Sequence, residues 1–190
     1  GLGTVYLHTP TRDDELEADF ERSRAFTRFL SEGLKTESEL AKILEERGIW
    51  TSADDKKMED LISALAEKQI EYRAAKQGGA KWKRLRQEML EIRKEQIELL
   101  ARKQSYFAHT VEVKAQSVWW EYLLFRCAYD ENGKRLWATY EDYLKEASSR
   151  AGLTLLAEFM RFYNGLSDNF FDLLAKEETE QQRSGEPDGE

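Results

Sequence analysis

Proline is almost absent from this chain, and that absence limits the folds open to it. The two prolines are Pro10 and Pro187, so the whole stretch between them lacks the strongest breaker of helices. Of the 190 residues, 41% are hydrophobic and 35% are charged, which is typical of long helices with one buried stripe and a solvated face. The sequence therefore predicts an all-α fold.

A pair of adjacent glycines marks the longest predicted element. Apolar residues recur at helical spacing from Met58 to Tyr72, and Gly78 and Gly79 then interrupt the helix. Beyond the glycines, steps of three and four residues form a coiled-coil seam, which consists of Trp82, Leu85, Met89, Ile92, Gln96, Leu99, Lys103 and Tyr106. Because a two-residue linker forces two helices to run antiparallel, residues 51–109 are predicted to form a long helical hairpin, coiled-coil-like in its packing.

A second apolar stripe lies beside this seam and consists of Leu90, Ile97, Leu100 and Phe107. It predicts that the second helix of the hairpin contacts more than one neighbour. The hairpin is therefore expected either to pack on the rest of the chain or to project from it toward a partner.

The segments before the hairpin are a short strand and two helices. Residues 1–10 include a β-branched and aromatic run, Thr4 to His8, which predicts a strand-like segment that pairs with a partner or with upstream residues. Residues 11–50 should form two helices capped by Thr11 and Thr36. The buried stripe expected for the first of them is Leu16, Phe20, Phe26, Phe29 and Leu30.

The segment after the hairpin, residues 110–176, is dense in aromatic residues and is expected to form the helical core. One buried helix should run from Thr110 to about Tyr129, and a last helix from about Leu153 to Lys176. The remaining residues, 177–190, are rich in glutamate and have no apolar side chains, so we expect a disordered acidic tail.

The residue types that carry catalysis or bind metals are scattered. His8 and His109 lie far apart in sequence, and Cys127 has no second cysteine for a disulfide or a shared metal ion. Cys127 sits in an apolar helix, which favours an inert buried thiol, and its neighbour Arg126 is a candidate for a buried ion pair. No glycine-rich phosphate loop occurs. The sequence therefore predicts no catalytic, cofactor-binding or metal-binding site. We expect that the protein is not an enzyme.

Two groups of residues are candidates for contacts with a partner. At the predicted hairpin tip, a basic cluster surrounds Trp82 and suits a phosphate or an acidic partner; its competing interpretation is a solvated helix start, softened by Glu88 and Glu91. At helical spacing Trp119 and Trp120 are expected to belong to the core. The alternative is that one of them reaches the surface as a partner contact, because the two point about 100° apart on a helix. The candidate partner-binding residues are Lys81, Trp82, Arg84, Arg86, Trp119 and Trp120.

Charge and hydropathy restrict the partners and the compartment. The net charge of −8 argues against a general nucleic-acid binder. No run approaches the ~20 apolar residues that span a bilayer, and no signal peptide is recognisable. The single cysteine fits a reducing compartment. We expect a soluble cytoplasmic protein with no membrane contact and no cofactor.

Four short strings resemble one class of proteins. These are Val-Tyr-Leu-His-Thr-Pro-Thr at 5–11, Gly-Leu-Lys-Thr-Glu-Ser-Glu-Leu at 33–40, Arg-Gly-Ile-Trp-Thr at 47–51 and Phe-Ala-His-Thr-Val-Glu at 107–112. They look like small helical morphogenesis proteins of tailed phages, in the tail assembly chaperone and baseplate hub group. The resemblance implies a non-enzymatic protein that binds virion or tail-assembly components, in the host cytoplasm or in the virion, and it is compatible with an oligomer.

Two other functions stay open at this point. One is a nucleic-acid-associated adaptor that uses the basic hairpin tip, and salt-dependent binding lost on reversing Arg84 and Arg86 would identify it. The other is a small helical enzyme of unknown reaction, which would need a polar pocket that a single sequence does not reveal.

Overall fold

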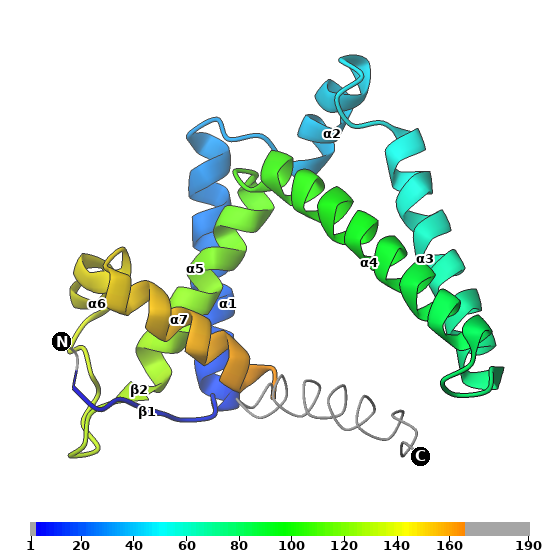
Figure 1. The fold of residues 1–190 in the computed structure, drawn as a ribbon. Helices are drawn as coiled ribbons and strands as arrows, with labels where there is room; N and C mark the ends of the chain where they lie inside the picture. The colour runs from blue at the N-terminus through cyan, green and yellow to red at the C-terminus, as the bar shows by residue number, and fades with distance from the viewer. Residues whose placement is uncertain (1–2, 166–190) are drawn as a thin grey trace, which may run out of the picture. The chain divides into compact units, whose positions relative to one another are not determined.

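The computed structural model describes residues 3–165, which fall into two compact units. The terminal unit contains the described residues up to Gly33 and those from Lys114 onward, and the central unit is Leu34–Val113. Within the described residues there are seven helices and one two-stranded antiparallel sheet (Figure 1). The predicted helical fold is confirmed. The predicted segment of residues 11–50 is divided between the two units, because its first helix belongs to the terminal unit.

Four helices build the terminal unit. They are α1 (Arg12–Ser31), α5 (Val111–Cys127), whose first residues belong to the central unit, α6 (Tyr140–Ala147) and α7 (Arg150–Tyr163). Threonine or serine caps three of them. The Thr11 side chain accepts from the Asp14 N–H, that of Thr139 from Asp142, and that of Ser149 from Gly152. The helix starts therefore follow local sequence signals.

The core of the terminal unit is centred on α5. Leu123 and Leu124 have no exposed surface, and Phe125 and Cys127 are buried beside them. Other elements contribute the rest of the buried cluster, namely Ala18, Ala128, Trp137, Tyr143 and Phe159. The prediction that the aromatic-rich helix forms the centre of the core is confirmed.

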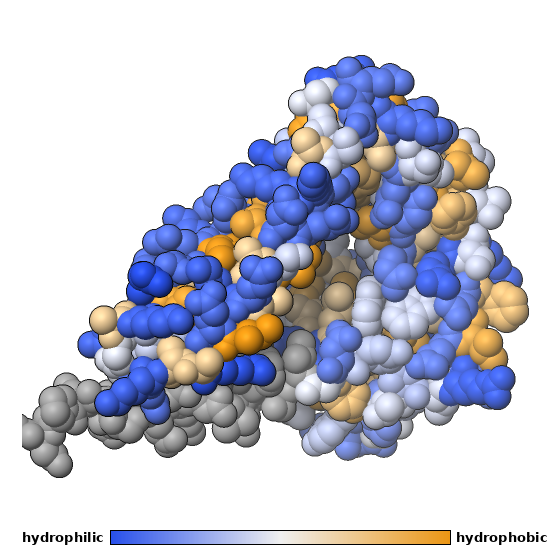
Figure 2. Space-filling model, turned by 90° about the vertical axis from the view of Figure 1, so that its right-hand side faces the viewer, coloured by the Kyte–Doolittle hydropathy of each residue, from blue (hydrophilic) through white to orange (hydrophobic). Residues whose placement is uncertain are grey.

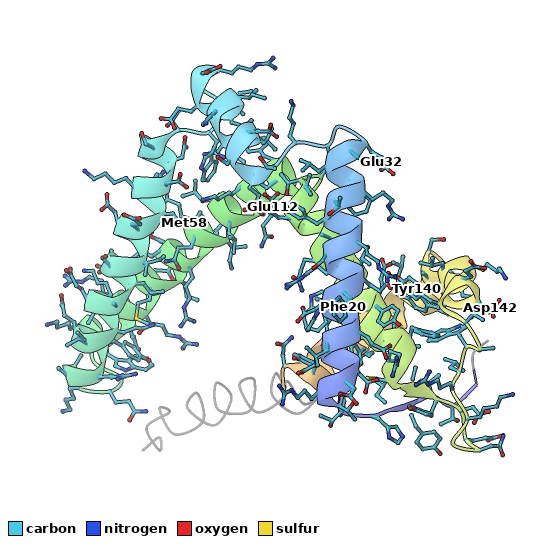
Figure 3. All side chains as sticks on the ribbon, turned by 180° about the vertical axis from the view of Figure 1, so that it is seen from behind. Phe20, Glu32, Met58, Glu112, Tyr140 and Asp142 are labelled. Carbon is cyan, nitrogen blue, oxygen red and sulfur yellow. The ribbon has the colours of Figure 1, made fainter. Side chains whose placement is uncertain are left out.

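The stripe predicted to bury α1 is wrong in part. Leu16, Phe20 and Leu30 are exposed, Phe20 by 66%, while the buried residues of the helix are Ala18 and Ala25 (Figure 3). Small side chains let another element approach the helix closely, so α1 packs through its alanines and turns the larger side chains outward. Phe26 and Phe29 are half-buried.

The strand-like segment near the N-terminus pairs with a later segment of the same chain, which the sequence did not predict. Strand β1 (Tyr6–Leu7) lies antiparallel to β2 (Ala128–Tyr129), with Tyr6 opposite Tyr129. The His8 N–H donates to the Cys127 carbonyl at 2.9 Å and extends the contact. The helix expected to reach Tyr129 therefore ends at Cys127, because the next two residues are used as a strand.

Three helices build the central unit, namely α2 (Glu37–Glu46), α3 (Ser52–Ala74) and α4 (Ala80–Phe107). Between α3 and α4, Gly78 adopts a φ of 76°, a left-handed conformation that suits glycine. Ion pairs join the helices in antiparallel order: Lys57 to Glu95 at 2.6 Å, Lys68 to Glu88 at 2.7 Å, and Lys81 to Glu71 at 3.6 Å. The two helices thus run antiparallel, and the end of α3 lies beside the start of α4 (Figure 1).

The last predicted helix is described only in part. Helix α7 begins at Arg150, earlier than the expected Leu153, because Ser149 serves as its cap. The remainder of that predicted helix, through Lys176, and the predicted acidic tail at 177–190 lie outside the described residues.

Candidate protein-docking site

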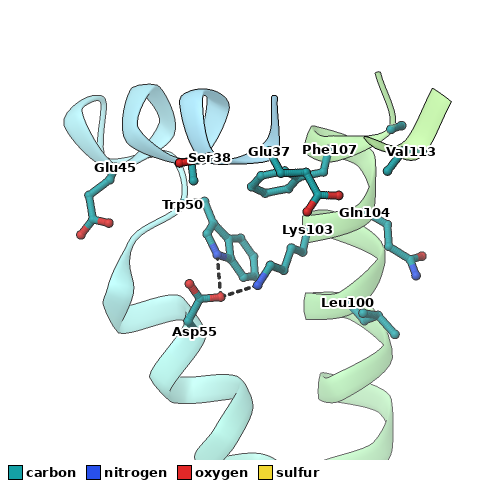
Figure 4. A pocket seen from close by; sticks show the side chains of 12 residues that line it. Glu37, Ser38, Glu45, Trp50, Asp55, Leu100, Lys103, Gln104, Phe107 and Val113 are labelled. Carbon is teal, nitrogen blue, oxygen red and sulfur yellow. Dashed lines mark hydrogen bonds and ion pairs between the residues drawn. The ribbon is translucent and has the colours of Figure 1, made fainter. Parts of the chain in front are cut away.

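A pocket of about 700 Å³ opens in the central unit between α2, the connection from α2 to α3, and the last turns of α4 (Figure 4). We call it the Trp50 pocket. Apolar and polar side chains share its lining, which consists of Glu37, Ser38, Ala41, Glu45, Trp50, Asp55, Leu100, Lys103, Gln104, Phe107, Ala108 and Val113. Its size falls within the range of protein ligand pockets.

The end of α2 places Trp50 in this pocket. Gly48 has a φ of 64°, its N–H donates to the Glu45 carbonyl at 3.0 Å, and the Ile49 N–H donates to the Leu44 carbonyl at 2.9 Å. These two bonds form a Schellman ending, which turns the chain back along the helix. Trp50 is consequently only 4% exposed and packs in a cluster with Leu44 and Leu99.

Trp50 is held by Asp55 and by two cations of α4. The indole Nε1–H donates to Asp55 Oδ1 at 3.0 Å, and Lys103 Nζ donates to the same oxygen at 2.6 Å (Figure 4). The Lys103 hydrogen bond lowers the pKa of Asp55 against the opposing effect of burial. Arg102 and Lys103 lie 5.3 and 5.5 Å from the centre of the indole ring, within cation–π range.

Two of the residues that line the Trp50 pocket, Glu37 and Glu45, are exposed acidic side chains, and we call them its rim. Lys103 offsets the charge of Asp55, whereas Glu37 and Glu45 add two further carboxylates to the lining. The Glu37 main chain is fixed by a bond from its N–H to Glu112 Oε2 at 2.9 Å. The arrangement suits an apolar side chain that enters between Leu100 and Phe107 and carries a cation beside it.

The four predicted contact residues of the hairpin tip lie together at the start of α4. Trp82 stacks on Tyr72 with ring centres 4.9 Å apart, and the Arg86 guanidinium lies 5.9 Å from the Trp82 ring. Lys81 pairs with Glu71 at 3.6 Å, and Arg84 pairs with Glu88 at 3.3 Å. Two of the three cations thus have carboxylates of the same chain beside them, which weakens the positive field available to a phosphate.

Trp119 and Trp120 lie in the terminal unit, whereas the tip residues lie in the central unit. The rings of Trp119 and Trp120 meet edge to face, with their centres 4.8 Å apart. Both rings also contact that of Tyr163, at centre-to-centre distances of 5.8 and 5.2 Å. Both tryptophans are half-buried and pack against the core of the unit. Neither is the fully exposed anchor that the sequence offered as one of two interpretations.

A second pocket, of about 560 Å³, lies within the terminal unit between α1, α5 and α6. Glu121 and Tyr140 line it, and burial raises the pKa of both side chains. Arg24, Arg28 and Lys114 also contribute to the lining. It has less apolar surface than the Trp50 pocket, and we expect it to suit small polar ligands better than a protein side chain.

Cys127 matches the inert thiol that its sequence context predicts. It is 1% exposed, and burial raises its pKa to about 12. Among residues 3–165, no three or more His, Cys, Asp or Glu side chains are grouped so that they could hold a metal ion. Over the same residues, no helix is long and apolar enough to span a membrane.

The sequence did not identify the Trp50 pocket as a site. Its two signals were Trp50, two residues after the helix-ending Gly48, and Lys103, one of two polar residues on the seam of α4. The contact between them, through Asp55, depends on the antiparallel alignment of α3 with α4, which spacing within one helix does not reveal.

Comparison of the chain with protein-family models, with curated proteins and with solved structures found no match. Function is therefore inferred from the Trp50 pocket, from the charges around it and from the four strings described above.

Proposed function

We propose that this chain is a non-enzymatic protein-binding module whose central unit holds a segment of another protein in the Trp50 pocket. The observation that carries the proposal is the combination of an apolar lining, formed by Trp50, Leu100 and Phe107, with an acidic rim at Glu37 and Glu45. Binding sites for protein segments commonly join an apolar anchor pocket to polar groups at the edge.

The chemistry of the pocket also restricts its occupant. A volume of about 700 Å³ admits one large apolar side chain together with part of its backbone. The two rim carboxylates favour a lysine or arginine next to that side chain, because an opposite charge is attracted and an acidic neighbour is repelled. The proposed ligand is therefore a segment with one aromatic or long aliphatic residue flanked by a cation.

Helices α3 and α4 serve, in this proposal, as a coiled-coil-like hairpin that supports the pocket at one end and offers further contacts at the other. Lys81, Trp82, Arg84 and Arg86 are the contacts proposed for an acidic partner at the tip. Trp119 and Trp120 are proposed as weaker contributors, since both are half-buried.

The class of partner comes from the resemblance of the four strings to tailed-phage morphogenesis proteins. It suggests that the bound segment belongs to a virion or tail-assembly protein, met in the host cytoplasm or in the virion. Pairwise co-expression with tail proteins encoded beside this chain would test this part. Binding to one of them that is lost when the Trp50 pocket is blocked would support it, and binding to none would remove the phage assignment.

The pocket itself is tested by blocking it from α2. Ala41 is exposed and lines the pocket, so Ala41→Trp fills the space without removing a buried side chain. Ala101→Trp is the matched control, because Ala101 is also exposed and helical but does not line the pocket. A displayed random-peptide library selected on the wild-type chain supplies the ligand.

We expect the selected peptides to share a large apolar residue beside lysine or arginine. Their affinity should fall at least tenfold, about 1.4 kcal/mol, for Ala41→Trp and stay unchanged for Ala101→Trp. Peptides that bind Ala41→Trp as well as the wild type would exclude the pocket as the site. Selection of no peptides at all would count against a protein-segment binder.

A further inference from the structure

Helix α3 is a long helix whose apolar side chains are at most half-buried. None of its 23 residues is buried, and the 28 residues of α4 bury only Leu85 and Leu99. Large apolar side chains of both helices are exposed, with Ile62 at 58%, Leu90 at 51% and Ile97 at 67%. Since most helix stability in proteins comes from packing of an apolar face, this pair of helices lacks part of the packing that it needs.

The exposed residues follow a second seam. On α4, Arg86, Leu90, Arg93 and Ile97 alternate steps of four and three residues, as the first seam does. On α3, the half-buried Met58, Leu61 and Leu65 continue the first seam. Glu59 and Ile62 directly follow the first two of these residues. We call Glu59, Ile62, Arg86, Leu90, Arg93 and Ile97 the outer seam.

Both halves of the outer seam lie on the same side of the helix pair. Lys57 and Glu95 each precede a residue of the first seam and meet across it at 2.6 Å, which marks one edge. Ile62 and Arg93 each follow a residue of the first seam, and in an antiparallel pair such positions lie together at the opposite edge. Hydrophobic residues also break the mostly hydrophilic surface in the space-filling view (Figure 2).

We propose that the outer seam is the interface between two copies of this chain, with α4 of each copy packed on α3 of the other in a four-helix bundle. Such bundles bury two apolar stripes on each helix, which matches the two seams of α4. The interface goes beyond the Trp50 pocket, since none of its residues lines that pocket. It shares only Arg86 with the proposed contacts of the tip, and here the acidic partner of Arg86 is the second copy.

Charge selects a second copy as the occupant. Helix α3 carries six acidic and four basic side chains, whereas α4 carries eight basic and four acidic ones. Within the described part of the chain, no ion pair is formed by Glu59 of α3 or by Arg86 and Arg93 of α4. A two-fold arrangement that packs α4 of one copy on α3 of the other brings Arg86 and Arg93 to the side of α3 that carries Glu59. The two-fold symmetry makes the same contact twice.

The first test is the mass of the full chain in solution. Light scattering on the eluting wild-type protein should give twice the 22.2 kDa of one chain at micromolar concentration. Leu90→Glu should raise the dimer dissociation constant at least a hundredfold, because it places a charge in the apolar centre. Leu153→Glu is the matched control, since Leu153 is 57% exposed on α7, and it should leave the mass unchanged.

A charge exchange gives a second test that leaves the apolar residues in place. Glu59→Arg should weaken the dimer at least tenfold, and Arg93→Glu in the same chain should restore most of the affinity. Circular dichroism should show unchanged helix content in all variants. A wild-type chain that stays at the mass of one copy at the highest concentrations would overturn the proposal, as would a Leu90→Glu dimer of unchanged affinity, even if another protein binds the outer seam.

Discussion

Arg126 ties the middle of the terminal unit to the start of α1. Its guanidinium donates to Asp14 at 2.9 Å and also pairs with Glu17, and the side chains of Arg126 and Asp14 are only 16% and 13% exposed. Arg126→Met should therefore lower the free energy of unfolding by about 3 kcal/mol, because it leaves a buried carboxylate unpaired. Arg24→Met is the control; Arg24 is 77% exposed in its pair with Glu21, and denaturant unfolding should show a loss below about 0.5 kcal/mol.

The same variant should change the dependence of stability on pH. Burial raises the pKa of Asp14, but hydrogen bonds from Thr11 and the charge of Arg126 outweigh it and hold the pKa below its usual value. A lowered carboxyl pKa stabilises the fold above the unfolded pKa of about 3.9, and this contribution disappears as pH falls below it. The loss caused by Arg126→Met should therefore shrink between about pH 5 and 3. A loss independent of pH would contradict this role.

Cys127 should not react in the folded protein. With its pKa raised to about 12 by burial, almost no thiolate exists at pH 8, and its 1% exposure blocks reagents. A disulfide reagent should modify it only after unfolding in guanidinium, which serves as the control for its intrinsic reactivity. Rapid reaction under native conditions would show that the thiol is accessible.

At this scale the sequence predicts the character of a residue better than its partner. Arg126 stands beside Cys127 in an apolar helix, so it was a candidate for a buried ion pair; the structure shows the pair, with both side chains partly buried. Asp14 and Glu17, more than a hundred residues away, were not identifiable as its partners, because several acidic side chains lie near the start of α1 and nothing local singles out these two.

The ends of the helices were readable because their signals are local. Thr11 and Thr36 each form a capping box with an acidic residue three positions later, and α1 and α2 begin directly after them. The buried side of α1 was not readable. Its larger apolar residues suggested one stripe, but Ala18 and Ala25 are the buried residues, and only the neighbouring elements decide which face is covered.

Helices α3 and α5 should differ strongly in amide hydrogen exchange. Helix α5 contains the fully buried Leu123 and Leu124, whereas α3 has no buried residue, so α3 should open at a much lower free energy. In the Leu90→Glu chain, which we expect to be a monomer, α3 amides should exchange at least a hundredfold faster than α5 amides. Equal protection of the two helices in that chain would contradict the weak packing of α3.

The two units should respond separately to a mutation in the core of one of them. Leu124 has no exposed surface and belongs to the terminal unit, and Leu124→Ala should cost about 3 kcal/mol by leaving a cavity. Hydrogen exchange should speed up in α5 while the affinity of the central unit for a selected peptide stays the same. Lost peptide binding in a folded Leu124→Ala chain would show that the pocket depends on the terminal unit.

The division into units was hidden from the sequence for a physical reason. Helix α1 belongs to the same unit as the described residues from Lys114 onward. In the sequence, the whole central unit lies between these two parts. Such a return of the chain depends on contacts over long sequence distances, and periodicity reports only on neighbours within a helix. The Trp50 pocket depends on similar long-range alignment, since Asp55 and Lys103 lie 48 residues apart.

The most direct test of the central claim is a hydrogen-exchange footprint of a selected peptide on the full chain. Binding at the Trp50 pocket should protect amides in residues 37–45 of α2 and in residues 100–108 at the end of α4, and it should leave α6 and α7 unchanged. The Ala41→Trp chain should show no footprint. Protection confined to the terminal unit, or to the start of α4 around Trp82, would contradict the proposed site.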